Sequence, residues 1–150
     1  MANQKPDETA GIGASVVAVI DENTGRFALV LDKTKPEPHY WKFPGGKIDK
    51  GDVDPEHPYD DHLAADHAAV REVREETGVA VQVSRLGKID KKTHVQYLYV
   101  GLGDFADLVA TGDEGETVKA FSLDQIKGLS NFFPNHLPIL GMALNLVGWE

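Results

Sequence analysis

The stretch Arg71-Glu72-Val73-Arg74-Glu75-Glu76-Thr77-Gly78-Val79 decides the fold. Drawn as a helix at about 100° per residue, it places Glu72, Glu75 and Glu76 within an arc of about 100°. Like charges four residues apart destabilise a helix, so this face carries a local conflict. Hard divalent cations bind carboxylate oxygens and would relieve it. Helix geometry alone leaves two interpretations open, a cation site and a charged surface in contact with water.

The helix that carries this acidic face is expected to begin near Asp60 or Asp61, because aspartate caps helix N-termini well. Gly78 suits the position just past its end. Upstream, residues 15–20 and 27–31 are apolar and β-branched runs separated by turn-forming residues. This pattern predicts a β-hairpin.

Further strands are expected downstream at residues 79–83, 95–100 and 118–121. Helices are expected at residues 123–127 and at about 135–146, where leucines recur at helical spacing. Strands and helices mixed in this order predict one α/β (α+β) domain. We expect a flexible tail at residues 1–12 and a single domain over residues 13–150.

Length and composition agree with a single domain. The chain has 150 residues, of which 41% are hydrophobic and 26% charged, a balance typical of globular proteins. It contains no cysteine, which excludes disulfides and thiolate zinc sites. The first ten residues hold no apolar run of the kind found in secretory signals, and no stretch is long enough to span a bilayer. We therefore expect a cytoplasmic protein with no membrane partner.

The net charge restricts the partners. A formal charge of −9 disfavours duplex nucleic acid, whose binding depends on Lys and Arg neutralising phosphates. A small phosphorylated ligand remains compatible with this charge if divalent cations bridge the two acidic parties. A second copy of the chain, in a homodimer, is left open as a further partner.

The stretch 71–79 resembles the core of the Nudix box, RE-U-x-EE-x-G-U, in which U is an aliphatic residue. With average residue usage, such a match arises about once in 10⁷ starting positions. Residues 43–52, Phe-Pro-Gly-Gly-Lys-Ile-Asp-Lys-Gly-Asp, resemble the loop that leads into the box. Membership of the Nudix (MutT-like) hydrolase family implies an α-β-α sandwich with a mixed central sheet and a catalytic loop-helix.

The chain departs from the family pattern G-x5-E-x7-RE in two ways. Asp52 stands where the family has glutamate, and 18 residues rather than seven separate it from Arg71. The extra length corresponds to an insertion at about residues 53–63. A longer surface loop costs little closure entropy, so the fold is not expected to suffer. The resemblance therefore assigns no role to Asp52, because its side chain is shorter than that of glutamate and the segment that joins it to the box is longer.

The resemblance implies a metal-dependent pyrophosphohydrolase that cleaves a phosphoanhydride bond in a nucleoside diphosphate linked to a group X. The identity of X is left open, so the substrate could be a nucleoside triphosphate, a dinucleoside polyphosphate, a nucleotide sugar or a capped RNA end. The alternative is a catalytically silent Nudix-like module that binds a nucleotide. All three box glutamates are present, which favours the enzyme, whereas the insertion keeps the alternative open.

The family pattern also implies roles for individual residues. Glu72, Glu75, Glu76 and the Gly46 carbonyl would bind Mg²⁺ or Mn²⁺. Arg71 would hold Glu75 or the preceding loop.

The general base would be a box glutamate, Glu72 or Glu75, or an acid on a later loop. Of the two acids on that loop, Glu114 and Glu116, we favour Glu116. A surface turn is the alternative for this loop.

Gly45 and Gly46 would let the backbone approach the substrate phosphates closely. Trp41 would stack on a base or fill the core. Asn135 lies in a stretch, residues 132–136, that resembles the place where some family members hold the nucleobase, and packing is its alternative.

Overall fold

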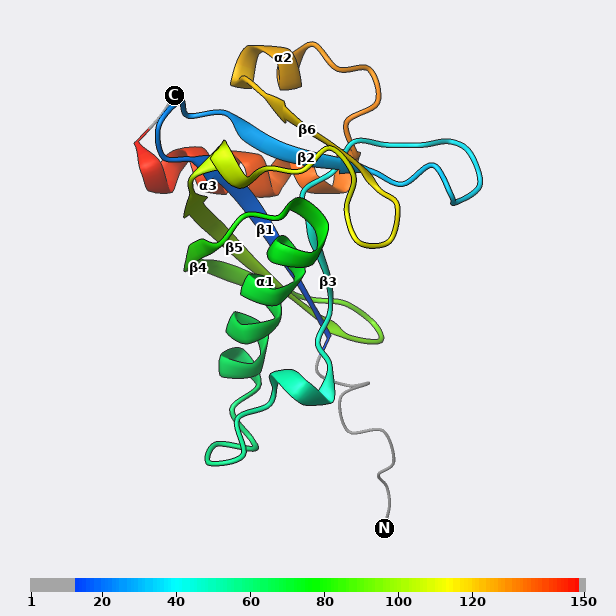
Figure 1. Ribbon diagram of the computed structural model, residues 1–150. Helices are drawn as coiled ribbons and strands as arrows, with labels where there is room; N and C mark the ends of the chain where they lie inside the picture. Colours follow the sequence, from blue (N-terminus) through cyan, green and yellow to red (C-terminus); the bar gives the residue numbers. More distant parts are fainter. Residues whose placement is uncertain (1–12, 149–150) are drawn as a thin grey trace.

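The computed structural model describes residues 13–148, and the tail expected at residues 1–12 lies outside them. A mixed sheet of six strands forms the centre of the molecule (Figure 1). Its strand order is β4-β5-β1-β2-β6, and β3 pairs with β1 beside this path. Strands β1 and β5 are parallel and the other pairs are antiparallel. The strands are β1 (Ala14–Asp21), β2 (Phe27–Leu31), β3 (Gly45–Lys47), β4 (Val81–Asp90), β5 (Val95–Gly103) and β6 (Thr117–Phe121).

Helices cover both faces of this sheet. On one face, α1 (Asp61–Thr77) packs against Val17 and Val19 of β1, and on the other, α3 (Leu137–Val147) packs against the alternate residues of that strand. This alternation is the period of two that a strand buried on both faces requires. A short α2 (Leu123–Lys127) follows β6. The fold is therefore the α-β-α sandwich with a mixed sheet that the sequence predicts.

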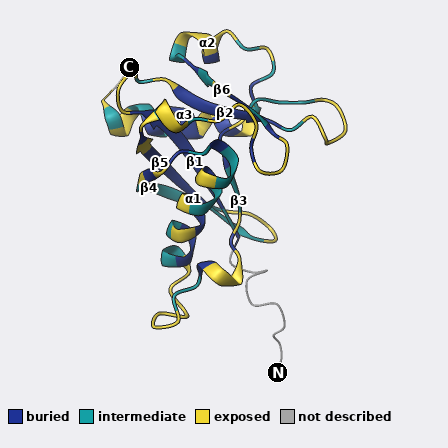
Figure 2. Ribbon diagram, viewed as in Figure 1, coloured by how far each residue is buried: buried dark blue, intermediate teal, exposed yellow. Residues whose placement is uncertain are grey.

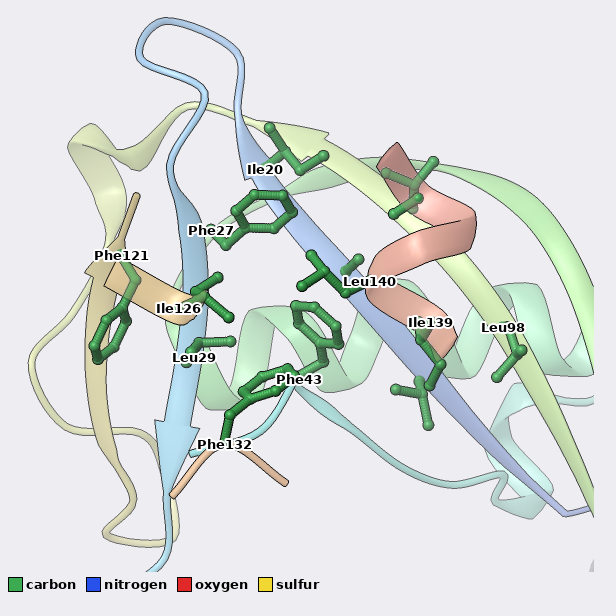
Figure 3. Packing of buried hydrophobic residues seen from close by; sticks show 14 residues of the cluster. Ile20, Phe27, Leu29, Phe43, Leu98, Phe121, Ile126, Phe132, Ile139 and Leu140 are labelled. Atoms are coloured by element: carbon green, nitrogen blue, oxygen red, sulfur yellow. The ribbon is translucent and has the colours of Figure 1, made fainter. Parts of the chain in front are cut away.

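The core on the α3 face is aromatic. Phe43 lies at its centre, with its ring 5.5 Å from that of Phe132 and 6.2 Å from that of Phe27 (Figure 3). Figure 2 shows that burial concentrates in the sheet, whereas the loop before α1 is exposed. Among the described residues, no helix is both long and apolar enough to cross a bilayer.

Helix α1 begins and ends where its capping residues predict. The Asp60 carboxylate accepts a hydrogen bond from the Leu63 N–H at 2.9 Å, and Gly78 ends the helix in the left-handed conformation at φ 81°. Buried alanines let α1 lie close to the sheet, where the Ser15 hydroxyl donates to the Ala65 carbonyl at 2.8 Å. This close packing fixes the helix that carries the acidic face.

The structure confirms the hairpin of β1 and β2 and the helix at residues 123–127, which is α2 and is capped by Ser122. The bounds predicted for the strand at residues 79–83 are wrong, because β4 starts at Val81 and runs to Asp90. In its second half, polar and exposed residues alternate with apolar ones. Hydrogen bonding to β5, rather than a continuous apolar run, therefore stabilises this part of the strand. The C-terminal helix starts at Leu137, after a turn of 3-10 helix over Pro134–His136. Residues 61–63 of the expected insertion belong to α1, so its loop comprises residues 53–60.

Candidate active site

Arg71 is the residue around which the candidate site is organised. Its Nε and Nη2 atoms each donate to a different oxygen of Asp52, both at 2.9 Å. Asp52 is buried in the short 3-10 turn Lys50–Asp52, with only 4% of it exposed. The hydrogen bonds that Arg71 donates to this carboxylate, and the carboxylate's charge, raise the pKa of Arg71. The bidentate pair keeps the guanidinium charged and fixed in orientation.

Arg71 also connects this turn to the acidic face of α1. Its Nη1 donates to Glu72 at 3.2 Å and to Glu75 at 3.1 Å, and its Nη2 donates to the Lys47 carbonyl at 3.1 Å. One guanidinium therefore holds the end of β3, the turn after it and two box glutamates.

The Asp52 turn is held at two further points. The Asp49 N–H donates to the Asp52 carboxylate at 2.8 Å, and His67 Nδ1 bonds the Asp52 carbonyl at 2.8 Å. His67 and Arg71 are one helical turn apart on α1, so both reach the same residue. The shorter Asp52 side chain thus meets Arg71 despite the insertion. The loop of extra residues lies between Asp52 and the start of α1, and Arg71 lies further along that helix.

Glu76 is the most strongly perturbed carboxyl of the site. Burial, together with the neighbouring charges of Glu72 and Glu116, raises its pKa to about 8. The Gly45 N–H donates to Glu76 Oε1 at 3.1 Å and offsets part of this effect. Burial likewise raises the pKa of Glu72. Ionising these groups together is unfavourable unless a cation accompanies them.

Two glycines bring loops against this acidic face. A Cβ atom at Gly46 would overlap the Glu72 carboxylate. A Cβ atom at Gly112 would lie 2.5 Å from Glu116 Oε1 and 2.6 Å from the Glu76 carbonyl oxygen. At Gly112 the obstacle includes backbone, so glycine alone fits there, whereas a side chain at Gly46 would displace the Glu72 carboxylate.

The loop at residues 111–116 brings Glu116 to the C-terminal end of α1. The Asp113 N–H donates to the Glu75 carbonyl at 3.0 Å, and Glu116 Oε1 accepts from the Glu114 N–H at 3.2 Å. Glu116 is buried, whereas Glu114 is exposed. Of the two acids considered on this loop, the one that lies beside Glu76 is therefore Glu116.

The oxygen donors fit a hard divalent cation. Within residues 13–148, no three histidine or acidic side chains are already arranged as a metal-ligand cluster. The charges of Glu72 and Glu116 nevertheless both act on Glu76, and the Gly46 backbone lies against Glu72. A cation bound here would offset the repulsion that Glu72 and Glu116 exert on ionised Glu76 and that helps to raise its pKa. Glu75 is half-exposed and paired with Arg71.

Of the residues expected to bind substrate, Gly45 and Gly46 lie against the acidic face, whereas Trp41 packs against an aromatic ring of the core. Trp41 is partly buried and packs edge-on against Phe121, with ring centroids 4.9 Å apart. Asn135 is exposed in the 3-10 turn before α3. Gly45 and Gly46 lie in β3 against α1.

Two histidines of this region escaped the sequence analysis. His136 is buried, and its Nδ1 accepts from the Phe43 N–H at 3.1 Å. Burial lowers its pKa to about 4, so the ring is neutral. No periodicity marks this contact, because His136 and Phe43 are far apart in the chain. His67 carries a signal, its spacing of four from Arg71, but spacing alone does not identify the Asp52 carbonyl as its partner.

Comparisons with known proteins agree with this architecture. A family model described as NUDIX domain matches residues 11–140. No curated protein matches the sequence. Among solved structures, a NUDIX family hydrolase from Clostridium perfringens is similar at 18% identity and a TM-score of 0.66, covering 89% of this chain and 96% of that one. A MutT structure, from work on the Aliivibrio salmonicida and Vibrio cholerae proteins, is similar at 18% identity and a TM-score of 0.64, covering 89% of this chain and 97% of that one.

Shewanella oneidensis NrtR, in a complex with a 27mer DNA, is similar at 16% identity and a TM-score of 0.68. That match covers 91% of this chain but 62% of NrtR, so a large part of NrtR has no counterpart here. At these identities the structural likeness establishes the fold. The family model, which spans most of the sequence and includes the acidic helix, establishes more: the chain belongs to the NUDIX domain family of hydrolases.

Proposed function

We propose that this chain is a metal-dependent pyrophosphohydrolase that cleaves a phosphoanhydride bond in a nucleoside diphosphate linked to X. The observation that carries the proposal is the raised pKa of the partly buried Glu76, with Glu72 and Glu116 beside it and the Gly45 N–H donating to it. Neighbouring carboxylates that are at least partly withdrawn from water are suited to bind a cation and to transfer a proton.

Glu72, Glu75, Glu76 and the Gly46 carbonyl would hold Mg²⁺ or Mn²⁺ in this proposal. Such a cation neutralises phosphate oxygens and lowers the pKa of bound water. Glu75 would have to share its carboxylate with Arg71, 3.1 Å away.

The chain's own residues would orient the reaction. Arg71 would hold Glu72 and the Gly46–Lys47 backbone in register by its bonds to Asp52 and Lys47. Glu116 would accept the proton of the attacking water, with Glu72 as the other candidate. The burial of Glu116 close to Glu76, at the C-terminal end of α1, supports this role.

A catalytically silent nucleotide-binding module is the second candidate, and it rests on the insertion at residues 53–60. We do not extend the DNA binding of NrtR to this chain, since its charge of −9 opposes contact with duplex phosphates. A cytoplasmic location fits the absence of cysteine and is part of the proposal, and the homodimer stays a prediction.

The decisive experiment is a substrate panel. The purified chain is incubated with nucleoside triphosphates, dinucleoside polyphosphates, nucleotide sugars and a capped RNA oligonucleotide, each with Mg²⁺, with Mn²⁺ and with EDTA. Cleavage that requires metal supports the proposal, and the product pair identifies the bond that breaks. Saturable nucleotide binding without cleavage in any metal supports the silent module instead.

A further inference from the structure

A hollow of about 170 Å³ lies between the loop after β2 and the segment before α3, and none of the roles assigned so far uses it. The loop between β2 and β3 forms one wall with Asp32, Lys35, His39, Tyr40 and Lys42. Phe133, which precedes α3, forms the other wall. The hollow thus joins segments about 90 positions apart in the chain.

The lining combines positive charge with aromatic surface. Lys35 and Lys42 contribute two ammonium groups and Asp32 one carboxylate, so the lining is net positive in a chain of charge −9. Asp32 is itself engaged, because its Oδ1 accepts from the Thr34 N–H at 3.0 Å and from the Thr34 hydroxyl. An anion is therefore better matched to this hollow than a cation or a neutral polar group.

Aromatic rings shape the same space. The Tyr40 and Phe133 rings meet at 5.6 Å with an interplanar angle of 47°. The Lys42 ammonium lies 5.9 Å from the centre of the Phe133 ring. Ring surface and ammonium groups side by side match a planar group that carries phosphate.

Lys42 connects the hollow to the candidate active site. It precedes Gly45 by three residues, which span at most about 11 Å even when fully extended. The backbone of Lys42 is fixed by reciprocal hydrogen bonds with Val30, at 2.9 and 3.0 Å. The Gly45 N–H in turn donates to Glu76 Oε1 of the acidic face, at 3.1 Å. One ligand can therefore touch Lys42 and the acidic face together.

We infer that this hollow binds the phosphate-bearing far end of the substrate, so that X carries phosphate of its own. The inference rests on the proposed function and narrows it to substrates with three or more phosphates. Nucleoside triphosphates and dinucleoside polyphosphates share this chemistry. A nucleotide sugar offers Lys35 and Lys42 a neutral group and leaves their charge unused.

The test compares Lys35→Gln, Lys42→Gln and the double variant with the wild-type chain. Lys33→Gln is the matched control, since Lys33 is exposed on the same loop and does not line the hollow. Substrates are ATP, diadenosine tetraphosphate and an ADP-sugar, which share the adenosine. We expect KM for the first two to rise about tenfold per lysine removed with kcat little changed, because each lysine contributes one charge-assisted contact. KM for the ADP-sugar should change less than twofold.

A second measurement separates this inference from the proposed function. Inorganic tripolyphosphate is titrated against each variant in EDTA, and its binding is followed by calorimetry. Binding to the wild-type chain and to Lys33→Gln, weakened in the other variants, supports the inference even if no substrate is cleaved. Equal tripolyphosphate binding by all variants, or equal KM changes for all three substrates, overturns the inference and leaves pyrophosphohydrolysis standing.

Discussion

The guanidinium of Arg71 grips both oxygens of the Asp52 carboxylate, each at 2.9 Å. The two residues are separated by 18 residues, 11 more than the Nudix pattern provides, and aspartate stands where the pattern has glutamate. The fold absorbs both changes without losing the contact. Arg71 also donates to Glu72 and Glu75, so the position of this turn affects the positions of both carboxylates.

Arg71→Lys tests this role. Lysine keeps the charge but cannot reproduce the planar fork that bonds Asp52 twice while reaching the box glutamates. We expect kcat/KM to fall at least about tenfold and the concentration of Mg²⁺ for half-maximal activity to rise. Circular dichroism should report an intact fold. Wild-type metal dependence in this variant would show that Arg71 does not position the carboxylates.

His67→Ala removes the hydrogen bond to the Asp52 carbonyl and leaves the Arg71 pair in place. We expect a several-fold loss of kcat with KM little changed, because the turn that anchors Arg71 loosens while the substrate contacts remain. His67→Asn retains a donor near the Nδ1 position and should restore most of the loss. His57→Ala, an exposed histidine of the same region, serves as the control. Equal effects of His67→Ala and His67→Asn would refute the role of this hydrogen bond.

Local rules predict the helix of the site well. Asp60 and Gly78 mark the ends of α1, and a period of 3.6 places the three glutamates on one face, all within a single segment of chain. The choice of Glu116 as an acid of the site was predicted from the family resemblance and not from geometry. The structure then places Glu116 beside Glu76.

Contacts between distant segments could not be predicted in the same way. The partner of Asp52 depends on the path of a loop for which neither periodicity nor capping holds information. The full length of β4 depends on its pairing with β5, since half of its residues are polar. The hollow between Lys42 and Phe133 forms only after the sheet and α3 have packed.

Gly46→Ala tests the close approach of β3 to α1. The added methyl group would overlap the Glu72 carboxylate, the mobile end of a side chain, so we expect Glu72 to move rather than the backbone. Hydrolysis should fall at least about tenfold while the melting temperature changes by only a few degrees. Gly51→Ala, with no atom within 4 Å of the added methyl group, should behave like the wild type. A normal rate in Gly46→Ala would place Glu72 outside the reaction.

His136 predicts a loss of stability in acid. Its pKa in the folded chain is about 4, below the ordinary value of 6.5, so the unfolded chain takes up a proton first as the pH falls. Stability is therefore fully present above about pH 6.5 and declines toward pH 4 by at most about 1.4 kcal/mol per pH unit.

His136→Asn keeps an acceptor for the Phe43 N–H and removes the titration. Urea unfolding at pH 7 and at pH 4.5 should show a smaller difference between the two values in this variant than in the wild type. The exposed His57→Asn should leave the difference unchanged. The same acid loss in all three proteins would assign it to other groups.

Glu76→Gln combines a catalytic and a thermodynamic prediction. Glutamine keeps the acceptor for the Gly45 N–H but removes the charge that would bind metal. We expect hydrolysis to fall at least about a hundredfold with the fold intact.

In EDTA, the unfolded chain ionises Glu76 near its ordinary pKa of 4.5, whereas the folded chain retains the proton to about pH 8. The folded state thus binds more protons across this range, and its stability declines as the pH rises from 4.5 to 8. Glu76→Gln should flatten that decline, and Mg²⁺ should counteract it in the wild type only, because the cation stabilises the ionised form. Urea unfolding at pH 5.5 and pH 8, with EDTA and with Mg²⁺, measures both effects. A wild-type stability that is independent of pH and of Mg²⁺ would contradict a partly buried, metal-binding Glu76.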